Sequence, residues 1–71
     1  MSWDTLAPER RQFIEDNLTA LQLQVVRARL NTFTFRQIAD AMNLDEATVR
    51  GHYKRAQRRL ANATRTQEEA A

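Results

Sequence analysis

Five basic side chains between residues 46 and 60 are the residues in this chain best placed to do chemistry, and that chemistry is the binding of anions. They are Arg50, Lys54, Arg55, Arg58 and Arg59, and one acid, Glu46, precedes them. The net charge of the whole chain is only +2, so positive charge is concentrated in this segment. Such focusing is typical of proteins that bind nucleic acid. A solvated basic helix without a partner has the same charge pattern, and charge alone does not separate the two interpretations.

Residue types that catalyse reactions or bind metals are scarce. The chain has 71 residues and no cysteine, which excludes a disulfide, a thiolate nucleophile and a cysteine-containing zinc site. The single histidine, His52, cannot form a metal centre alone and has no nucleophile nearby in a plausible triad. We therefore expect His52 to be a packing residue or a phosphate contact. The sequence predicts no catalytic residue, no metal and no cofactor, in a protein that is not an enzyme.

Composition favours an all-α fold. One glycine and one proline leave little material for the turns of a sheet, while a hydrophobic share of 42% is enough for a packed core. No apolar run approaches the roughly 18 residues that span a bilayer, so no membrane contact is expected. The beginning, Met1-Ser2-Trp3-Asp4, does not resemble a secretory signal. These features predict a cytoplasmic protein associated with the nucleoid.

Periodicity and end signals predict four helices, which cover residues 8–17, 19–30, 34–42 and 46–60. Two of them begin with a capping box, in which a threonine is followed three residues later by a glutamine. The pairs are Thr19 with Gln22 and Thr34 with Gln37. We expect residues 1–62 to form one compact four-helix domain and residues 63–71, which have no apolar stripe, to be frayed helix passing into a disordered tail.

The buried faces of these helices follow from the spacing of apolar residues. The side chains expected to face inward are Leu21, Val25, Ala28 and Val26 in the second helix, Phe35, Ile38, Ala39 and Met42 in the third, and Val49, Tyr53, Ala56 and Leu60 in the fourth. Trp3 and Leu6 are expected to fold back onto the first helix. The aromatic residues, Phe13 and Phe33 among them, are mostly core by their spacing, which argues against a base-stacking surface for single-stranded RNA.

Only Asn43, Leu44 and Asp45 separate the third and fourth predicted helices. A linker this short makes the helices cross steeply, with Leu44 filling the corner and Ala39 small enough for the close approach. Asn43 falls where the chain must adopt a left-handed conformation, which asparagine tolerates second best after glycine. The segment from residue 34 to residue 60 is therefore predicted to be a helix-turn-helix.

A helical wheel gives the fourth helix an outward face opposite its apolar one. That face carries Ala47, Gly51, Lys54 and Arg58, with Thr48, Arg50 and Arg55 beside it. Small residues near the start and long cations farther along suit a helix that enters the major groove of DNA. Gly51 costs roughly 1 kcal/mol of helix stability relative to alanine, so close approach to DNA is the functional explanation and a neutral accident is the alternative.

The same residues resemble the helix-turn-helix shared by region four of bacterial sigma factors and LuxR-type regulators. The resemblance covers residues 18–60 and is carried by Leu18-Thr19, Val25-Val26, Ile38-Ala39, Met42-Asn43-Leu44-Asp45, Thr48-Val49-Arg50, His52-Tyr53, Ala56 and Leu60. The family usually has glycine where this chain has Asn43. The resemblance implies that the fourth helix reads the major groove and the third helix positions the domain against the DNA backbone. It adds Arg36 as a phosphate contact and His52 at the groove edge.

The expected function is that of a regulator of transcription that binds a specific sequence in double-stranded DNA. The predicted DNA-binding residues are Arg36, Glu46, Ala47, Thr48, Arg50, Gly51, His52, Lys54, Arg55 and Arg58. A homodimer on a two-fold site is expected, because one helix covers little DNA. Two alternatives stay open: an adaptor or antagonist that uses a sigma-like domain on RNA polymerase or another regulator, and a subunit for DNA packaging or recombination.

Overall fold

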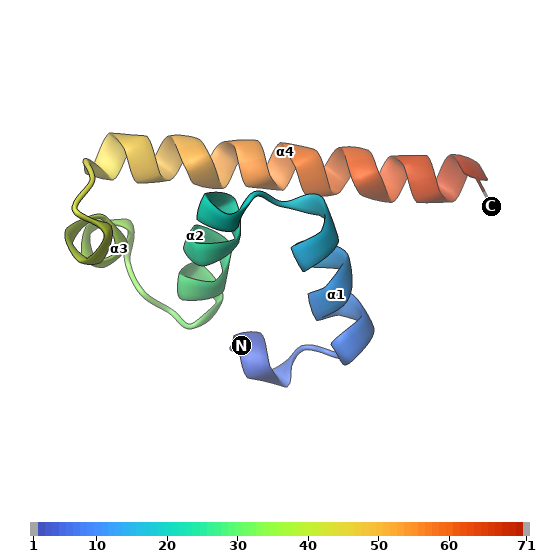
Figure 1. Ribbon diagram of the computed structural model, residues 1–71, viewed down its shortest axis with the longest axis horizontal. Helices are drawn as coiled ribbons and strands as arrows, with labels where there is room; N and C mark the ends of the chain where they lie inside the picture. The colour runs from blue at the N-terminus through green and yellow to red at the C-terminus, as the bar shows by residue number, and fades with distance from the viewer. Residues whose placement is uncertain (1, 71) are drawn as a thin grey trace.

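The computed structural model describes residues 2–70, which form one short 3-10 helix and four α-helices. These are η1 (Trp3–Thr5), α1 (Pro8–Asn17), α2 (Ala20–Leu30), α3 (Phe35–Met42) and α4 (Glu46–Ala70). The long helix α4 forms one side of the molecule, and α1, α2 and α3 lie along the same side of it (Figure 1). The predicted all-α fold with four helices is confirmed. None of the helices within these residues is long and apolar enough to cross a membrane.

Local hydrogen bonding explains where α2 and α3 begin. The Thr19 hydroxyl accepts a hydrogen bond from the Gln22 N–H at 3.2 Å, and the Gln22 side-chain oxygen accepts one from the Thr19 N–H at 3.1 Å. Thr34 and Gln37 form the same pair of bonds at 3.1 and 2.9 Å. Each capping box satisfies backbone donors that the first turn of a helix otherwise leaves free.

The core consists of two apolar clusters that meet along α2. The first contains Trp3, Ile14, Val26 and Ala56, and the second contains Val25, Ile38, Ala39 and Val49. The adjacent valines of α2 join different clusters, and α4 contributes one fully buried residue to each. Burying one of the valine or isoleucine side chains contributes roughly 1.5–3 kcal/mol to the free energy of folding. The two clusters therefore hold α4 along most of the helix-turn-helix.

The turn between α3 and α4 has the predicted left-handed residue. Asn43 has φ 56° and ψ 44°. The Leu44 N–H donates to the Ala39 carbonyl at 2.9 Å and the Asn43 N–H to the Asp40 carbonyl at 3.3 Å, which is the Schellman pattern of a helix end. Ala39 is buried, so its small side chain does lie at the close approach of α3 and α4.

Three apolar side chains expected in the core are exposed instead. Leu21 and Leu44 are each 37% exposed, and Phe33 is 49% exposed. The buried side of α2 is centred on Val25 and Val26 and includes Gln22, whose amide oxygen bonds to the cap, and this rotates Leu21 outward. Leu44 lies at the turn but is only partly covered, so it does not fill the corner as predicted.

Helix α4 extends ten residues beyond its predicted end at Leu60. The sequence placed a frayed and disordered tail after residue 62, but the chain is helical to Ala70. The lack of an apolar stripe means that the segment does not pack against the core, but it does not prevent a helix. The alanine, arginine, glutamine and glutamate of this segment all favour a helix. Residues 61–69 are exposed except for half-buried Ala63, as their polar composition predicts. Met1 and Ala71, which begin the predicted domain and end the predicted tail, lie outside the described residues.

Candidate nucleic-acid interface

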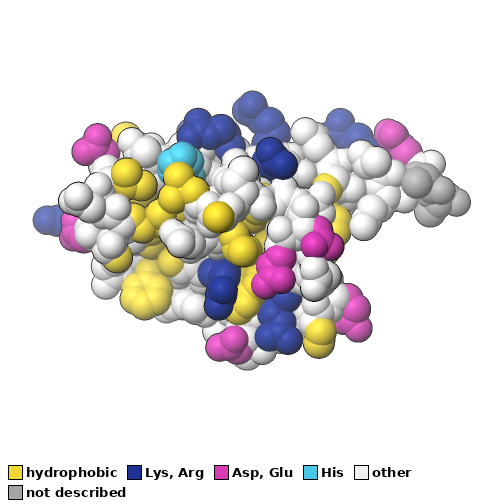
Figure 2. All heavy atoms as spheres, in the orientation of Figure 1, with side chains coloured by type: hydrophobic (Ala, Val, Ile, Leu, Met, Phe, Trp, Pro, Cys, Tyr) yellow, Lys and Arg dark blue, Asp and Glu magenta, His cyan; other side chains and the backbone are white. Residues whose placement is uncertain are grey.

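The basic face that the sequence predicted for α4 is exposed in the structure. Ala47, Lys54 and Arg58 are exposed, whereas Val49 and Ala56 on the other side of the same helix are fully buried. Lys and Arg side chains gather along the edge of the molecule that α4 forms (Figure 2). Since the apolar face is fixed by the core, this outward face has one orientation relative to the rest of the domain.

Gly51 lies in the middle of the outward face, and contact with another helix does not require a glycine there. The atoms nearest to a Cβ placed there would be those of the Arg55 guanidinium, with Nη2 at 3.6 Å, which is an ordinary contact distance. The same nitrogen donates a hydrogen bond to Nδ1 of His52 at 3.2 Å. The structure thus places half-buried His52 and exposed Arg55 together on one flank of Gly51, where Thr48 is exposed as well. Packing within the protein does not require a glycine at this position.

Arg50 lies on the opposite flank and is held by two contacts. Its Nη2 is 2.7 Å from Oε1 of Glu46, and its guanidinium carbon lies 4.8 Å from the ring centroid of Phe35. Within residues 2–70 this is the only ion pair, and both side chains are about half exposed. An exposed pair adds little stability. Glu46 therefore affects the interface mainly by orienting Arg50.

The beginning of α3 joins this second flank through Phe35, its first residue. The ring of Phe35 packs edge-on against Tyr53 of α4, with the centroids 5.4 Å apart. Arg36, the next residue, is exposed. A second guanidinium, that of Arg29 at the end of α2, lies 4.6 Å from the Phe35 centroid. Sequence reasoning missed Arg29, although a cation in the last turn of a helix that precedes the motif was visible in the sequence.

Arg59 belongs to the same basic segment but points elsewhere. Its Nε donates to the main-chain carbonyl of Asn17 at 2.9 Å. Asn17 ends α1, so the arginine satisfies a carbonyl that has no partner within its own helix. This contact fastens α1 to α4 and explains why the positive charge of Arg59 is not available on the outward face.

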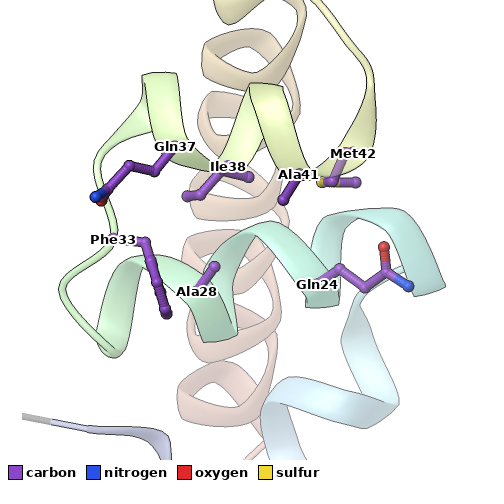
Figure 3. Close-up of a pocket in the computed structure, with 7 residues that line it drawn as sticks. All are labelled: Gln24, Ala28, Phe33, Gln37, Ile38, Ala41 and Met42. Carbon is purple, nitrogen blue, oxygen red and sulfur yellow. The ribbon is translucent and has the colours of Figure 1, made fainter.

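A separate apolar hollow of about 290 Å³ lies between α2 and α3. It is lined by Gln24, Ala28, Phe33, Gln37, Ile38, Ala41 and Met42. Figure 3 shows Ile38, Ala41 and Met42 of α3 facing Ala28 of α2, with Phe33 from the loop at one side and α4 behind them. No cation lines this hollow, so its chemistry differs from that of the outward face of α4. No group of three or more histidine, aspartate or glutamate residues within residues 2–70 is arranged to hold a metal ion.

One family of known proteins matches the chain. The family described as bacterial regulatory proteins, luxR family, matches residues 16–68, and this range includes the end of α1, all of α2 and α3, and most of α4. The match confirms the predicted LuxR-type helix-turn-helix. It begins after Trp3 and Ile14, which both lie in the core. No curated protein and no solved structure matches the chain significantly.

Proposed function

Because the chain belongs to the luxR family of bacterial regulatory proteins, we propose that it regulates transcription by inserting α4 into the major groove at a specific DNA sequence. The LuxR-type helix-turn-helix is a DNA-binding domain and not an enzyme, so the general activity follows from the family. Sequence specificity and the groove that α4 enters are the proposed part. The major groove of B-DNA is about 12 Å wide and admits one α-helix.

The observation that carries the proposal is Gly51 in the middle of the exposed basic face of α4. A glycine inside a helix costs stability, and no neighbouring helix requires it here. A missing Cβ lets the helix backbone approach base edges, and Lys54 and Arg58 extend from the same face toward bases or phosphates. A helix face that met only water would gain nothing from a destabilising glycine among long basic side chains.

The two flanks of α4 match the two DNA strands that border a groove. On one flank, Arg50 and Arg36 lie near the beginning of α3, and they would contact the phosphates of one strand. On the other, Thr48, His52 and Arg55 would contact the other strand. In the free protein Arg55 bonds to His52 beside Gly51, so its side chain must turn outward when the helix enters the groove.

Selection of duplexes from a random library with the purified full chain tests this proposal. Selected duplexes would then be titrated by fluorescence anisotropy over a range of salt concentrations. We expect one enriched sequence, bound about 10³-fold or more tightly than unrelated DNA, with affinity that falls steeply as salt rises. Equal binding of all duplexes would favour the packaging or recombination alternative over a specific regulator. Absence of duplex binding would contradict the proposed role of α4.

Gly51→Ala is expected to stabilise the protein and weaken DNA binding at once. Alanine raises helix stability by about 1 kcal/mol, and the space above Gly51 accommodates a methyl group. The same methyl would separate α4 from the base edges, so we expect at least a tenfold loss of affinity for the selected duplex. Urea unfolding and anisotropy measure the two effects.

A matched control for Gly51→Ala is Thr66→Ala. It also raises helix propensity in α4, at an exposed position well beyond the basic face. It should leave duplex affinity unchanged. If Gly51→Ala leaves affinity unchanged as well, the glycine is a neutral accident.

We also propose that the protein binds its site as a homodimer. A single DNA-binding module of this size buries about 600–1,000 Å² of protein surface, which gives limited specificity. Two copies on a two-fold site double that buried area. Analytical ultracentrifugation of the chain with the selected duplex should show two protein chains for each duplex. A one-to-one complex on a site without two-fold symmetry would contradict this.

Contact with another protein is the second candidate function, and the exposure of Phe33 beside the apolar hollow favours it. An aromatic side chain that is 49% exposed next to an apolar surface is a common anchor at protein interfaces. RNA polymerase is the partner to test. If purified polymerase binds the chain, and Phe33→Glu abolishes that binding while leaving duplex affinity unchanged, this function is supported. If polymerase does not bind the unaltered chain, it is dismissed.

A further inference from the structure

Three helices meet at the ring of Phe35. The ring belongs to the first residue of α3, Arg50 comes from α4, and Arg29 comes from the last turn of α2. The two guanidinium carbons lie 4.8 and 4.6 Å from the same ring centroid. Tyr53 of α4 contacts the ring edge-on, with the centroids 5.4 Å apart. Both guanidinium groups therefore stack on one aromatic ring.

Of these two cations, only Arg50 has a carboxylate partner within residues 2–70. Glu46 pairs with Arg50. Arg29 donates from Nη1 to the main-chain carbonyl of Phe33 at 2.9 Å, and its Nε is buried without an acceptor in residues 2–70. Stacking on an aromatic ring contributes about 0.5–1 kcal/mol at an exposed site, which holds the group in place but does not cancel its charge. Arg29 is thus a stacked cation that has no carboxylate partner within residues 2–70.

The position of this cation relates it to the proposed DNA-binding face. Arg50 adjoins Lys54 on the flank of α4, and both line a hollow of about 260 Å³ together with Phe35, Tyr53 and Gln57. With α4 in the major groove, this flank borders the phosphates of one strand. Arg29 stacks on the same ring as Arg50, which brings the end of α2 beside this flank.

We propose that Arg29 is a DNA-binding residue that contacts a backbone phosphate beside the one contacted by Arg50. A planar guanidinium binds phosphate through two parallel hydrogen bonds, and one already ordered by stacking loses little freedom when it does so. The support helix α2 then contacts DNA together with α3 and α4. This inference rests on the proposed function of α4.

Arg29→Gln tests the inference through the salt dependence of binding. The full chain would be titrated with the selected duplex at several salt concentrations. A lost phosphate contact lowers the slope of log affinity against log salt by about 0.9, and it weakens binding to all duplexes by a similar factor. We expect that reduction in slope and about a tenfold loss of affinity. If Arg29 only holds the loop before α3 in place through its bond to the Phe33 carbonyl, the slope should not change in the folded protein.

Arg27→Gln is the matched control. Arg27 lies in the same helix and also stacks on an aromatic ring, with its guanidinium carbon 5.0 Å from the ring centroid of Trp3. It should retain the slope of the unaltered chain. If Arg29→Gln and Arg27→Gln both retain that slope, the inference is overturned, while duplex binding by the unaltered chain still supports the proposed function. If the unaltered chain fails to bind, the proposed function itself fails.

Arg29→Lys keeps the test decisive if the glutamine variant does not fold. Duplexes that carry one neutral methylphosphonate linkage would be scanned with the unaltered chain and with this variant. At the phosphate that Arg29 contacts, the neutral linkage should weaken the unaltered chain several-fold more than the lysine variant, because an ammonium group lacks the two-bond geometry. Identical profiles for the two proteins would overturn the inference.

Discussion

Replacing Lys54 and Arg58 together by glutamate is expected to weaken binding of the selected duplex by at least about 100-fold. Each replacement removes a charge-assisted contact that contributes about 1.5–3 kcal/mol, and each puts an acid on the face that meets phosphates. Both side chains are exposed, so the folded structure should be retained. Fluorescence anisotropy measures the affinity, and circular dichroism checks the fold.

The control for this double variant changes net charge by the same amount at positions away from the outward face of α4. Arg10 and Arg27 are both exposed and stack on Phe13 and Trp3. Changing both to glutamate should alter affinity by no more than a few-fold, because charges beyond about 10 Å are largely screened at 0.1 M salt. Equal losses in the two double variants would mean that only net charge matters. Unaltered binding by the Lys54 and Arg58 variant would show that α4 does not face DNA.

Features that depend on neighbours in the sequence could be predicted. The capping boxes at Thr19 and Thr34 need partners only three residues away, so their residue types were sufficient. Asn43 was identifiable because a three-residue linker demands a left-handed residue, and asparagine is the best non-glycine choice. Val49 and the basic side chains lie on opposite faces of α4, and helical periodicity alone predicts this.

Features that depend on how separate helices meet could not be predicted. Arg29 reaches the ring of Phe35 because the loop between them turns back at Thr32, which has φ 71° although it is not a glycine. Its residue type does not indicate that conformation. The exposure of Phe33 in the same loop was missed for the same reason. The end of α4 was predicted too early because the residues after Leu60 still favour a helix although they no longer pack against the core.

Trp3→Ala should have the largest effect on stability, although Trp3 precedes the part of the chain that matches the luxR family. The side chain is 4% exposed and packs with Ile14, Val26 and Ala56. Its backbone N–H donates to the side-chain oxygen of Asn31 at 2.9 Å. Replacing a buried tryptophan by alanine costs about 3–5 kcal/mol. A domain of this size has a total free energy of unfolding of roughly 4–11 kcal/mol, so much of it would be lost.

Urea unfolding followed by far-ultraviolet circular dichroism measures this loss, with Phe33→Ala as the control. Phe33 is also aromatic but half exposed, so its removal should cost roughly half as much as removal of a buried aromatic side chain, about 1.5–2.5 kcal/mol. Trp3 lies on the side of α2 away from the outward face of α4, so Trp3→Ala protein refolded with a stabilising osmolyte should bind the selected duplex with unaltered affinity. A cost below about 1 kcal/mol would mean that the segment before residue 16 is dispensable. The predicted cost makes that segment part of the DNA-binding domain, because it holds the side of α2 and α4 opposite the bases.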